Sequence, residues 1–475
     1  MRLFALLSAI CEVQSNDAVD VGYACALLAT LQVCLEAKIA AAHTDVPKYA
    51  ASLPERLLHL LLPPICAGGQ PMVAAALPVV QRASEMLAVV VPHIAAHHAQ
   101  GLFDALPHWF QLPDGMPAAA RAAVLDPSAP AMHSQLLAPC VAIVAALPRN
   151  VILPSDAWLD AALAWVLARD AAETQNAALE FQSVGFLVCA LTNKYTADEE
   201  PALCRFWDAL TTLPDERAAH ALDVWVWAAR GYLARGTAAG SAMLDRLQAL
   251  LGDERLGLAA ANAFRVLSVH DALLRRANGF QVRLLYKQRL LETLLPQLVA
   301  AYERAVPGSA MRTTCLVALA TLLPALPHAA LHARIVSLLP LLVHTLGIDD
   351  AGARTQAARA LFVTLQSVPV AEAAESRSSA EATVAAIQTH LDTLVTHLVA
   401  NVAPSPVTPP AARSASLQLL GALVPRLPHE ALVPHRRRVI QELGILGRGV
   451  DDPRRSVRAD AVDCRDVWYR VDVLA

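Results

Sequence analysis

Apolar residues recur along the chain at the three- and four-residue steps that place them on one face of a helix. The clearest case follows an acidic turn near the C-terminus. It consists of Val457, Ala461, Cys464 and Trp468. Asp452 and Pro453 precede this pattern and predict the N-cap and the first residue of a helix. Strand signals are almost missing, because no convincing alternation of β-branched residues is flanked by a hairpin turn. The pattern predicts an all-α protein.

A two-helix unit repeats in the second half of the chain. Its first helix has a leucine-rich face, and we predict it at Leu291–Tyr302, Val336–Leu346 and Ile387–Val399. A turn follows, and then an arginine with a small residue three positions later. These pairs are Arg312/Cys315, Arg354/Ala357, Arg413/Ser416 and Arg458/Ala461. Their arginines recur at intervals of 42, 59 and 45 residues, and the long interval contains an insertion, Ala371–Ala386, that we expect to be mobile.

Two helices per period in the low forties are typical of HEAT and armadillo repeats. A helix pair of this size cannot cover its own apolar face, so neighbouring pairs stack and share one core. We therefore predict an α-solenoid of roughly ten HEAT/armadillo-like helix pairs. Residues 1–180 would form its N-terminal helical repeats, with a loop near 111–133, and residues 181–470 a C-terminal HEAT-repeat domain.

Two local features of the repeats carry further expectations. The proline-rich segment 404–410 is predicted to be a rigid turn inside a repeat. The turn acid and the arginine that follows it, Asp452 and Arg458 in the last repeat, are expected to contribute to a ladder of ion pairs between successive repeats.

Composition raises the question of a membrane protein, because 56% of the residues are hydrophobic and the mean hydropathy is +0.41. A spanning helix needs about 20 largely uncharged residues. The best run, Met86–Ile94, contains a proline and a histidine and continues into two further histidines. We therefore expect a soluble helical protein without a membrane segment. The stretch Met1–Cys11 lacks a small-residue cleavage site, so we interpret it as the first helix rather than a secretory signal.

Nine cysteines are scattered through the helical patterns without any CxxC pair. An odd number in this arrangement favours reduced thiols that serve as small core residues of a cytosolic or nuclear protein. Zinc ions and iron–sulfur clusters need thiolates or histidines that converge at defined spacing, so no metal or cofactor is predicted. His93 and His97 lie four apart on one predicted helix face, but no third ligand follows, and we interpret them as surface histidines.

No motif predicts catalysis. The chain has neither a GxSxG sequence nor a phosphate-binding glycine-rich loop with a lysine. Gly444, Gly447 and Gly449 lack both the spacing of a dinucleotide-binding loop and a preceding strand, and we expect them to loosen the junction before the last turn. The sequence thus predicts a protein that is not an enzyme.

Arginines are concentrated near the C-terminus, with eight arginines against four acids between Arg426 and Arg458. Three interpretations are open: a solvated helix edge, a docking patch for an acidic protein surface, and a site for a phosphate backbone. The third is the weakest, because no interleaved aromatic residues offer base stacking and the net charge is −4. The candidate partner-binding residues are Arg436, Arg437, Arg438, Arg454, Arg455, Arg458 and Arg465.

The order of motifs from Phe181 to Trp468 resembles the C-terminal domain of the MMS-nineteen family, HEAT-repeat proteins named for methyl methanesulfonate sensitivity. The segment FLVCALTNKY (Phe186–Tyr195) is similar to the start of that domain. The most specific match is DDPRRSVRADAVDCRDVW (Asp451–Trp468), with its acid pair, its arginines and its tryptophan, which we expect in the core rather than at a contact. Members of the family are longer and have a separate N-terminal solenoid region.

The resemblance implies a scaffold of the cytosolic iron–sulfur cluster assembly (CIA) targeting complex. Family members bind a β-propeller subunit and a small subunit through the C-terminal repeats. They present apo client proteins, such as DNA repair helicases, polymerases and primase, for cluster insertion. A cytoplasmic and nuclear location and roles in DNA repair and transcription follow. The alternatives are a HEAT-repeat protein that binds nucleic acid directly in DNA repair, and an unrelated HEAT transport or regulatory scaffold.

Overall fold

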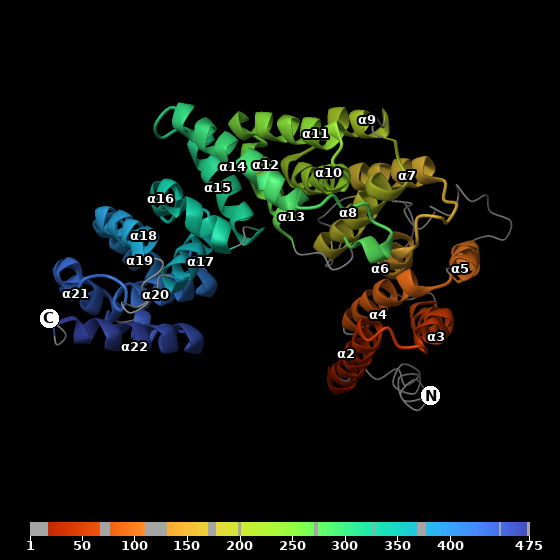
Figure 1. Ribbon diagram of the computed structural model, residues 1–475, viewed down its shortest axis with the longest axis horizontal. Helices are drawn as coiled ribbons and strands as arrows, with labels where there is room; N and C mark the ends of the chain where they lie inside the picture. The colour runs from red at the N-terminus through yellow and green to blue at the C-terminus, as the bar shows by residue number, and fades with distance from the viewer. Residues whose placement is uncertain are drawn as a thin grey trace. The chain divides into compact units, whose positions relative to one another are not determined.

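The computed structural model describes residues 18–66, 77–109, 131–169, 177–197, 201–269, 274–325, 328–367, 377–445 and 448–472. Within these ranges the regular elements are helices, and the only β pairing is one isolated bridge between Ser405 and Thr408 (Figure 1). The prediction of an all-α protein is confirmed.

The chain divides into two compact units. Unit 1 comprises Met1–Gln248 and Asp271–Tyr286, and unit 2 comprises Ala249–His270 and Lys287–Ala475. The predicted boundary between residues 180 and 181 lies inside helix α8 (Ala177–Lys194).

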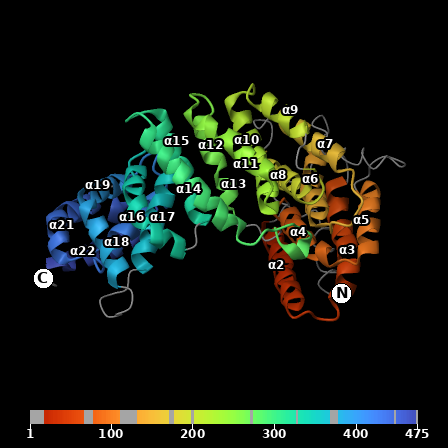
Figure 2. The same cartoon turned by 45° about the horizontal axis from the view of Figure 1, so that its top comes forward.

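In unit 1 the helices alternate between two packed rows. One row contains α2 (Ala18–Ala40), α4 (Leu77–Val90), α6 (Ala131–Ala146), α8 and α10 (Asp215–Arg235), each packed on the next. The other row contains α3 (Val46–Cys66), α5 (Ala96–Trp109), α7 (Ser155–Ala168) and α9 (Pro201–Leu210) (Figure 2). Helix α11 (Ala238–Ala249) follows α10.

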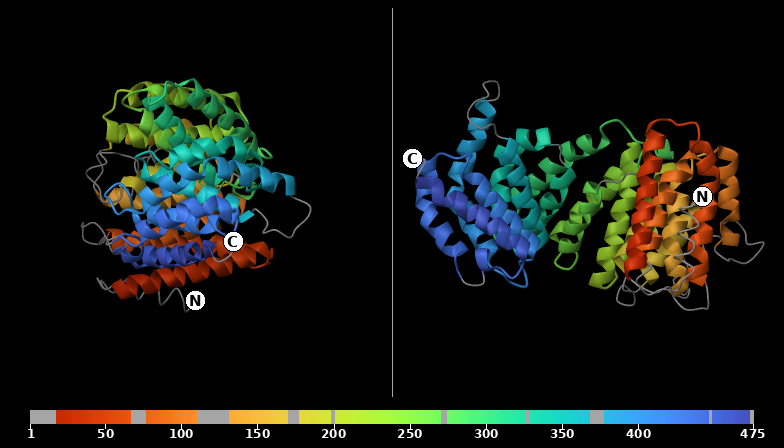
Figure 3. Two further views of the ribbon diagram at one scale, coloured as in Figure 1. Left: turned by 90° about the vertical axis from the view of Figure 1, so that its left-hand side faces the viewer. Right: turned by 90° about the horizontal axis from the view of Figure 1, so that it is seen from below.

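Unit 2 repeats this arrangement. One row contains α12 (Gly257–Ala263), α15 (Ala310–Leu322), α17 (Ala351–Ser367), α20 (Pro410–Leu423) and α22 (Arg455–Tyr469). The other contains α14 (Tyr286–Arg304), α16 (His328–Thr345), α19 (Leu391–Val402) and α21 (His429–Leu443), with α18 (Arg377–Thr389) beside α16 (Figure 3). The short α13 (Arg265–Ser268) follows α12. Each predicted pair of an arginine and a small residue lies on a helix of the first row, as an α-solenoid of helix pairs requires.

The period of the apolar residues explains this stacking. On α22 the buried residues are Val457, Ala461, Cys464 and Trp468, which are the four positions predicted from the sequence. Trp468 is fully buried, and its indole N–H donates to the Leu420 carbonyl at 3.0 Å. The apolar face of the last helix is therefore covered by α20 of the preceding pair.

Prolines occur inside the predicted leucine-rich helices without ending them. Pro296 lies within α14 and Pro340 within α16. Each of these helices continues for several residues beyond its proline, so the proline removes one backbone donor without closing the element.

One predicted insertion and one predicted helix differ from the sequence analysis. Residues 377–386 of the predicted insertion form most of α18, which packs on α16; residues 371–376 lie outside the described residues. The run Ile387–Val399, predicted as one helix, is divided between α18 and α19 at His390. The insertion is therefore in large part a helix of the array, and Thr383 and Ile387 are its buried residues.

The predicted loop near 111–133 and the predicted turn at 404–410 have different outcomes. Of the predicted loop near 111–133, residues 110–130 lie outside the described residues and α6 begins at Ala131. The predicted turn at 404–410 is confirmed, since α20 begins at Pro410 after the Ser405–Thr408 bridge.

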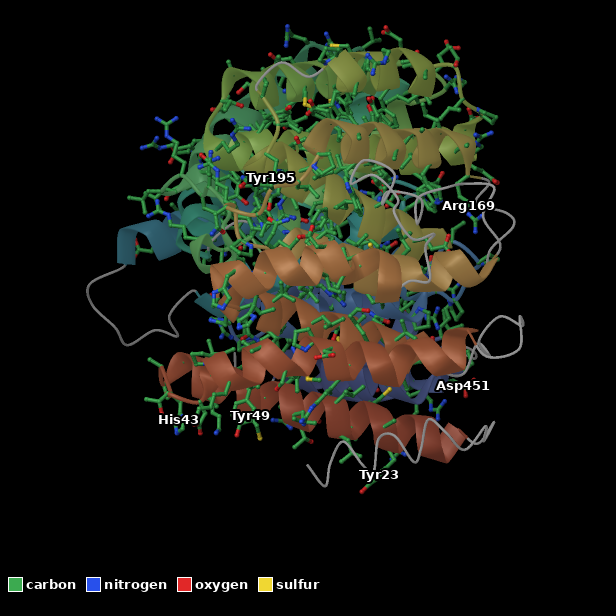
Figure 4. All side chains as sticks on the ribbon, turned by 90° about the vertical axis from the view of Figure 1, so that its right-hand side faces the viewer. Tyr23, His43, Tyr49, Arg169, Tyr195 and Asp451 are labelled. Atoms are coloured by element: carbon green, nitrogen blue, oxygen red, sulfur yellow. The ribbon has the colours of Figure 1, made fainter. Side chains whose placement is uncertain are left out.

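One helix among the described residues is long and apolar enough to cross a membrane by length and composition, namely Gly22–Ala40 with a mean hydropathy of 1.4. The sequence analysis did not single out this run. Only 17% of this window is buried, and Tyr23 projects from the surface (Figure 4). Core helices of soluble proteins and signal sequences meet the same criteria, so the absence of a membrane segment stays a prediction. The stretch Met1–Cys11 lies outside the described residues.

Candidate docking surface on the last repeats

A buried ion pair joins the last two helix pairs of unit 2. The Arg413 guanidinium on α20 donates from Nε to Asp452 Oδ2 at 2.7 Å and from Nη2 to Asp452 Oδ1 at 3.1 Å. The Arg413 and Asp452 side chains are 5% and 0% exposed. Nη1 of Arg413 donates to the Thr408 carbonyl in its own turn at 2.6 Å. The pair is thus bidentate and buried, and a bidentate contact is the strong form of an arginine–carboxylate interaction.

This pair joins successive repeats, as the sequence analysis expected for Asp452, but it is buried. The expectation that Asp452 is the N-cap is wrong, since α22 begins at Arg455 after Arg454. The physical reason is that Arg413 engages both carboxylate oxygens, and the Arg454 amide donates to Oδ1 at 2.8 Å outside the helix.

Gly449 lies in the turn between α21 and α22 that places Asp452 next to Arg413. Its φ is +48°, a left-handed conformation that side chains disfavour, and a Cβ here would lie 2.5 Å from the Leu443 carbonyl oxygen. This glycine therefore shapes a tight turn instead of loosening the junction, which corrects the expectation from the sequence. Gly447 lies outside the described residues.

In the preceding repeat an arginine also contacts the turn of the repeat that follows it. Arg354 on α17 donates from Nη1 to Asn401 Oδ1 at 2.8 Å and from Nη2 to the Val407 carbonyl. Asn401 in turn donates to the Leu346 carbonyl at 2.9 Å. The arginines of two successive repeats thus donate hydrogen bonds to the turn of the next repeat. The predicted ion pair is present at the Arg413 junction, whereas at the Arg354 junction the acceptors are an amide and a carbonyl oxygen.

Three of the seven candidate arginines contact another helix or an aromatic ring of unit 2. Arg436 on α21 donates to the carbonyls of Trp468 and Tyr469 at 3.3 and 3.1 Å, where α22 ends. Arg438 donates to Thr396 Oγ1 on α19 at 2.8 Å. Arg465 lies over the Tyr469 ring at 5.3 Å. These side chains stabilise helix ends and helix contacts.

The other four candidates differ in exposure. Arg437, Arg454 and Arg455 are exposed, and their side chains have no partner among the described residues. Arg458 is partly buried and donates from Nη1 to the Asp452 carbonyl at 2.7 Å. Three of these four, Arg454, Arg455 and Arg458, lie within the first turn of α22 and the residue before it. The candidates without a contact to another helix therefore lie at the start of α22 and at Arg437 on α21, and their role in docking stays a prediction.

Sequence reasoning missed a buried polar cluster in unit 1. Asn193 at the end of α8 donates from Nδ2 to the Gly231 and Gln281 carbonyls, both at 3.0 Å, and accepts the Gln281 amide at 2.7 Å. Lys194 donates to the carbonyls of Ala145 and Leu147 at 2.6 and 2.8 Å. The signal was present, because Asn-Lys-Tyr ends an otherwise apolar helix in FLVCALTNKY.

The cluster ties three segments of unit 1 together. Tyr195 adds a hydrogen bond from its hydroxyl to the Pro148 carbonyl at 3.2 Å, and its place is labelled in Figure 4. The Lys194 ammonium lies 4.4 Å from the centre of the Phe280 ring. The end of α8 thus donates hydrogen bonds to carbonyls at the end of α6, to a carbonyl of α10 and to the segment around Gln281, and it holds these segments together.

Burial lowers the pKa of Lys194 to about 7, because the charged ammonium is removed from water. The unfolded chain keeps the ordinary lysine pKa near 10.4 and binds the extra proton between these values. The free energy of unfolding should therefore rise with pH above about 7.

We expect the wild-type protein to gain roughly 2 kcal/mol of stability between pH 7 and pH 9 relative to Lys194→Met, since each pKa unit corresponds to about 1.4 kcal/mol. Denaturant unfolding of both proteins at each pH measures this difference. Groups other than Lys194 titrate in both proteins and cancel. A stability difference that does not change between pH 7 and pH 9 would contradict the assignment.

The cysteines and histidines agree only in part with the sequence interpretation. Cys140, Cys189, Cys315 and Cys464 are buried, whereas Cys34 and Cys204 are exposed and so are not core residues. Burial raises the pKa of Cys140 to about 12 and that of Cys315 to about 11, which keeps these thiols protonated.

His93 and His97 do not share a helix face. His93 ends the 3-10 helix η3 (Val91–His93) and α5 begins only at Ala96, because Pro92 and the following bend interrupt the helix. Among the residues that the structure describes, no group of three or more His, Cys, Asp or Glu side chains is placed to hold a metal ion.

Comparison with known proteins gives one family. A family model described as "RNAPII transcription regulator C-terminal" (MMS19_C) matches residues 1–424. The match includes residues 1–180 and ends before α21. The MMS19 nucleotide excision repair protein homolog of Bos taurus is 29% identical over 344 residues, which cover 70% of this chain and 30% of that protein.

A second curated relative also carries the MMS19 name. The DNA repair/transcription protein mms19 of Schizosaccharomyces pombe is 24% identical over 290 residues, covering 60% of this chain and 26% of that protein. The matched region thus spans less than a third of these relatives' length.

Solved structures similar to this chain include Kap121p bound to RanGTP. The similarity covers 90% of this chain and 39% of that chain, at 14% sequence identity and a TM-score of 0.46. A second is Kap121p bound to Nup53p, at 12% identity and a TM-score of 0.45, covering 99% of this chain and 45% of that chain.

The motif at Phe186–Tyr195 and the all-helical repeats agree with the family model over residues 1–424, whereas the motif at Asp451–Trp468 lies beyond the matched residues. The chain belongs to the MMS19 family and corresponds to its C-terminal region.

Proposed function

We propose that this chain is a non-enzymatic scaffold of the cytosolic iron–sulfur cluster assembly targeting complex, acting in DNA repair and transcription. Membership of the MMS19 family supports the proposal, as do relatives named for nucleotide excision repair and for DNA repair/transcription. The scaffold binds the β-propeller and small subunits of the complex and presents apo iron–sulfur clients, such as helicases, polymerases and primase. It acts in the cytoplasm and the nucleus.

The observation that carries the proposal is the set of exposed arginines on the last helix pair. Arg437, Arg454 and Arg455 have no side-chain partner among the described residues and are available to a protein surface. Arginine forks bind carboxylates in pairs of hydrogen bonds, which suits an acidic partner. In this proposal the partners and clients carry out the iron–sulfur chemistry, and this chain holds them next to one another.

Charge reversal tests the docking surface. We expect Arg454→Glu/Arg455→Glu to weaken binding of the purified β-propeller and small subunits at least about tenfold, mainly through slower association, because charges at an interface steer the encounter. Biolayer interferometry at two salt concentrations measures this. Both residues are exposed, so circular dichroism should show unchanged helix content.

Arg359→Glu is the matched control, since Arg359 is also exposed but lies on α17, away from the last helix pair. Unchanged affinity of the double variant would count against the docking surface. Salt-dependent DNA binding by the purified chain, lost in the same variant, would instead favour direct nucleic-acid binding.

A further inference from the structure

Arg413 shows how an arginine of this row receives a carboxylate. Its Nη1 is fixed by the carbonyl of Thr408 in its own turn, five residues earlier. This contact leaves the Nε and Nη2 edge pointing at the next repeat, where the carboxylate of Asp452 fits it with two hydrogen bonds. A guanidinium held in this way loses little freedom when the acid binds, which favours binding.

Arg458 occupies the same place one repeat later. Its Nη1 donates to the carbonyl of Asp452 in its own turn, six residues earlier, at 2.7 Å. Its Nε and Nη2 have no partner among the described residues, although the side chain is partly buried. Within unit 2, no described helix of this row lies beyond α22 (Figure 3). The Nε and Nη2 groups of Arg458, which correspond to those that bind Asp452 in Arg413, thus have no carboxylate partner among the described residues.

The surroundings of Arg458 are also uncovered. On α20, Leu417 follows Arg413 by one turn and is fully buried, and Val424, directly after α20, is 3% exposed. The corresponding residues of α22, Val462 and Tyr469, are 54% and 45% exposed. The face that the next repeat covers on α20 is open on α22.

This open face does not suit a further packed helix. Gly421 of α20 faces α22, and a Cβ there would make an ordinary van der Waals contact with Cys464 Cα at 3.6 Å. The corresponding position of α22 is Asp466, which is exposed and paired with Arg470. A further helix packed on this position would bury the charged pair at a cost in free energy, whereas a turn or loop can reach Arg458 without covering it.

We propose that Arg458 is a preformed receptor for one Asp or Glu carboxylate of a partner protein, presented on a turn, which takes the position on Arg458 that Asp452 takes on Arg413. The inference rests on the proposed function, in which a protein docks on the last repeats. It separates Arg458 from the neighbouring exposed arginines: Arg454 and Arg455 contribute attraction at longer range, and Arg458 supplies the bidentate contact.

The test compares Arg458→Lys with Arg458→Gln in the full chain, with the purified β-propeller and small subunits as the probe. Lysine keeps the charge and a donor for the Asp452 carbonyl but has no fork. We therefore expect both variants to bind at least about tenfold more weakly than wild type, which is the loss of a paired hydrogen bond to a charged group. Arg359→Lys is the control and should bind as wild type. Thermal unfolding verifies that each variant is folded.

The outcomes separate the inference from the proposed function. Binding of Arg458→Lys at the wild-type affinity would overturn the bidentate contact, because positive charge alone would then suffice. Wild-type affinity in both variants would overturn any role of Arg458 while leaving the proposed function intact. Failure of the wild-type chain to bind these subunits would overturn the proposed function and this inference together.

Discussion

Arg413→Met is expected to lower the free energy of unfolding of unit 2 by about 3–5 kcal/mol, the usual cost of removing one member of a buried ion pair. The reason is that the Asp452 carboxylate, fully buried, would keep only the Arg454 amide as a hydrogen-bond donor. The loss should appear in denaturant unfolding. Hydrogen exchange should increase across residues 410–472, because the pair joins α20 to the turn before α22.

The control for this prediction is Arg470→Met. Arg470 also pairs with an aspartate, Asp466, but the two side chains are 65% and 57% exposed, so its loss should cost at most about 1 kcal/mol. The double variant Arg413→Met/Asp452→Leu should recover most of the stability, since a buried pair can be replaced by apolar residues at little cost. A loss for Arg413→Met no larger than that for Arg470→Met would show that the pair does not hold the repeats together.

Asn193→Ala is expected to destabilise unit 1 by about 3 kcal/mol. The change removes three hydrogen bonds of a fully buried side chain and leaves the backbone amide and carbonyl of Gln281 without their partner. Each buried polar group left unsatisfied costs about 1–3 kcal/mol. Denaturant unfolding measures the loss, and hydrogen exchange should increase first in the segment around Gln281.

Asn150→Ala is the matched control, because Asn150 is an exposed asparagine in the same unit. Its replacement should change stability by less than about 0.5 kcal/mol. Equal effects of the two substitutions would mean that the cluster at the end of α8 contributes nothing specific to the packing of unit 1.

The sequence by itself determined the helical repeats. A period of three and four residues depends only on which side of a helix is apolar, so the residue pattern alone assigned Val457, Ala461, Cys464 and Trp468 to the core. The turn at 404–410 and the arginines on one row of helices followed from the same local signals. The motif at Asp451–Trp468 similarly pointed to the family that the comparison confirms.

Only the tertiary structure decided which polar groups meet. Asp452 lies near Arg458 in sequence, yet it pairs with Arg413 of the preceding repeat, because stacking brings the turn of one repeat against the helix of the previous one. The same stacking turned Arg436 and Arg438 toward neighbouring helices and left Arg454 and Arg455 exposed. Charges interact through space rather than along the chain. The sequence could therefore show that arginines are concentrated in this segment, but not which of them contact neighbouring helices and which stay exposed.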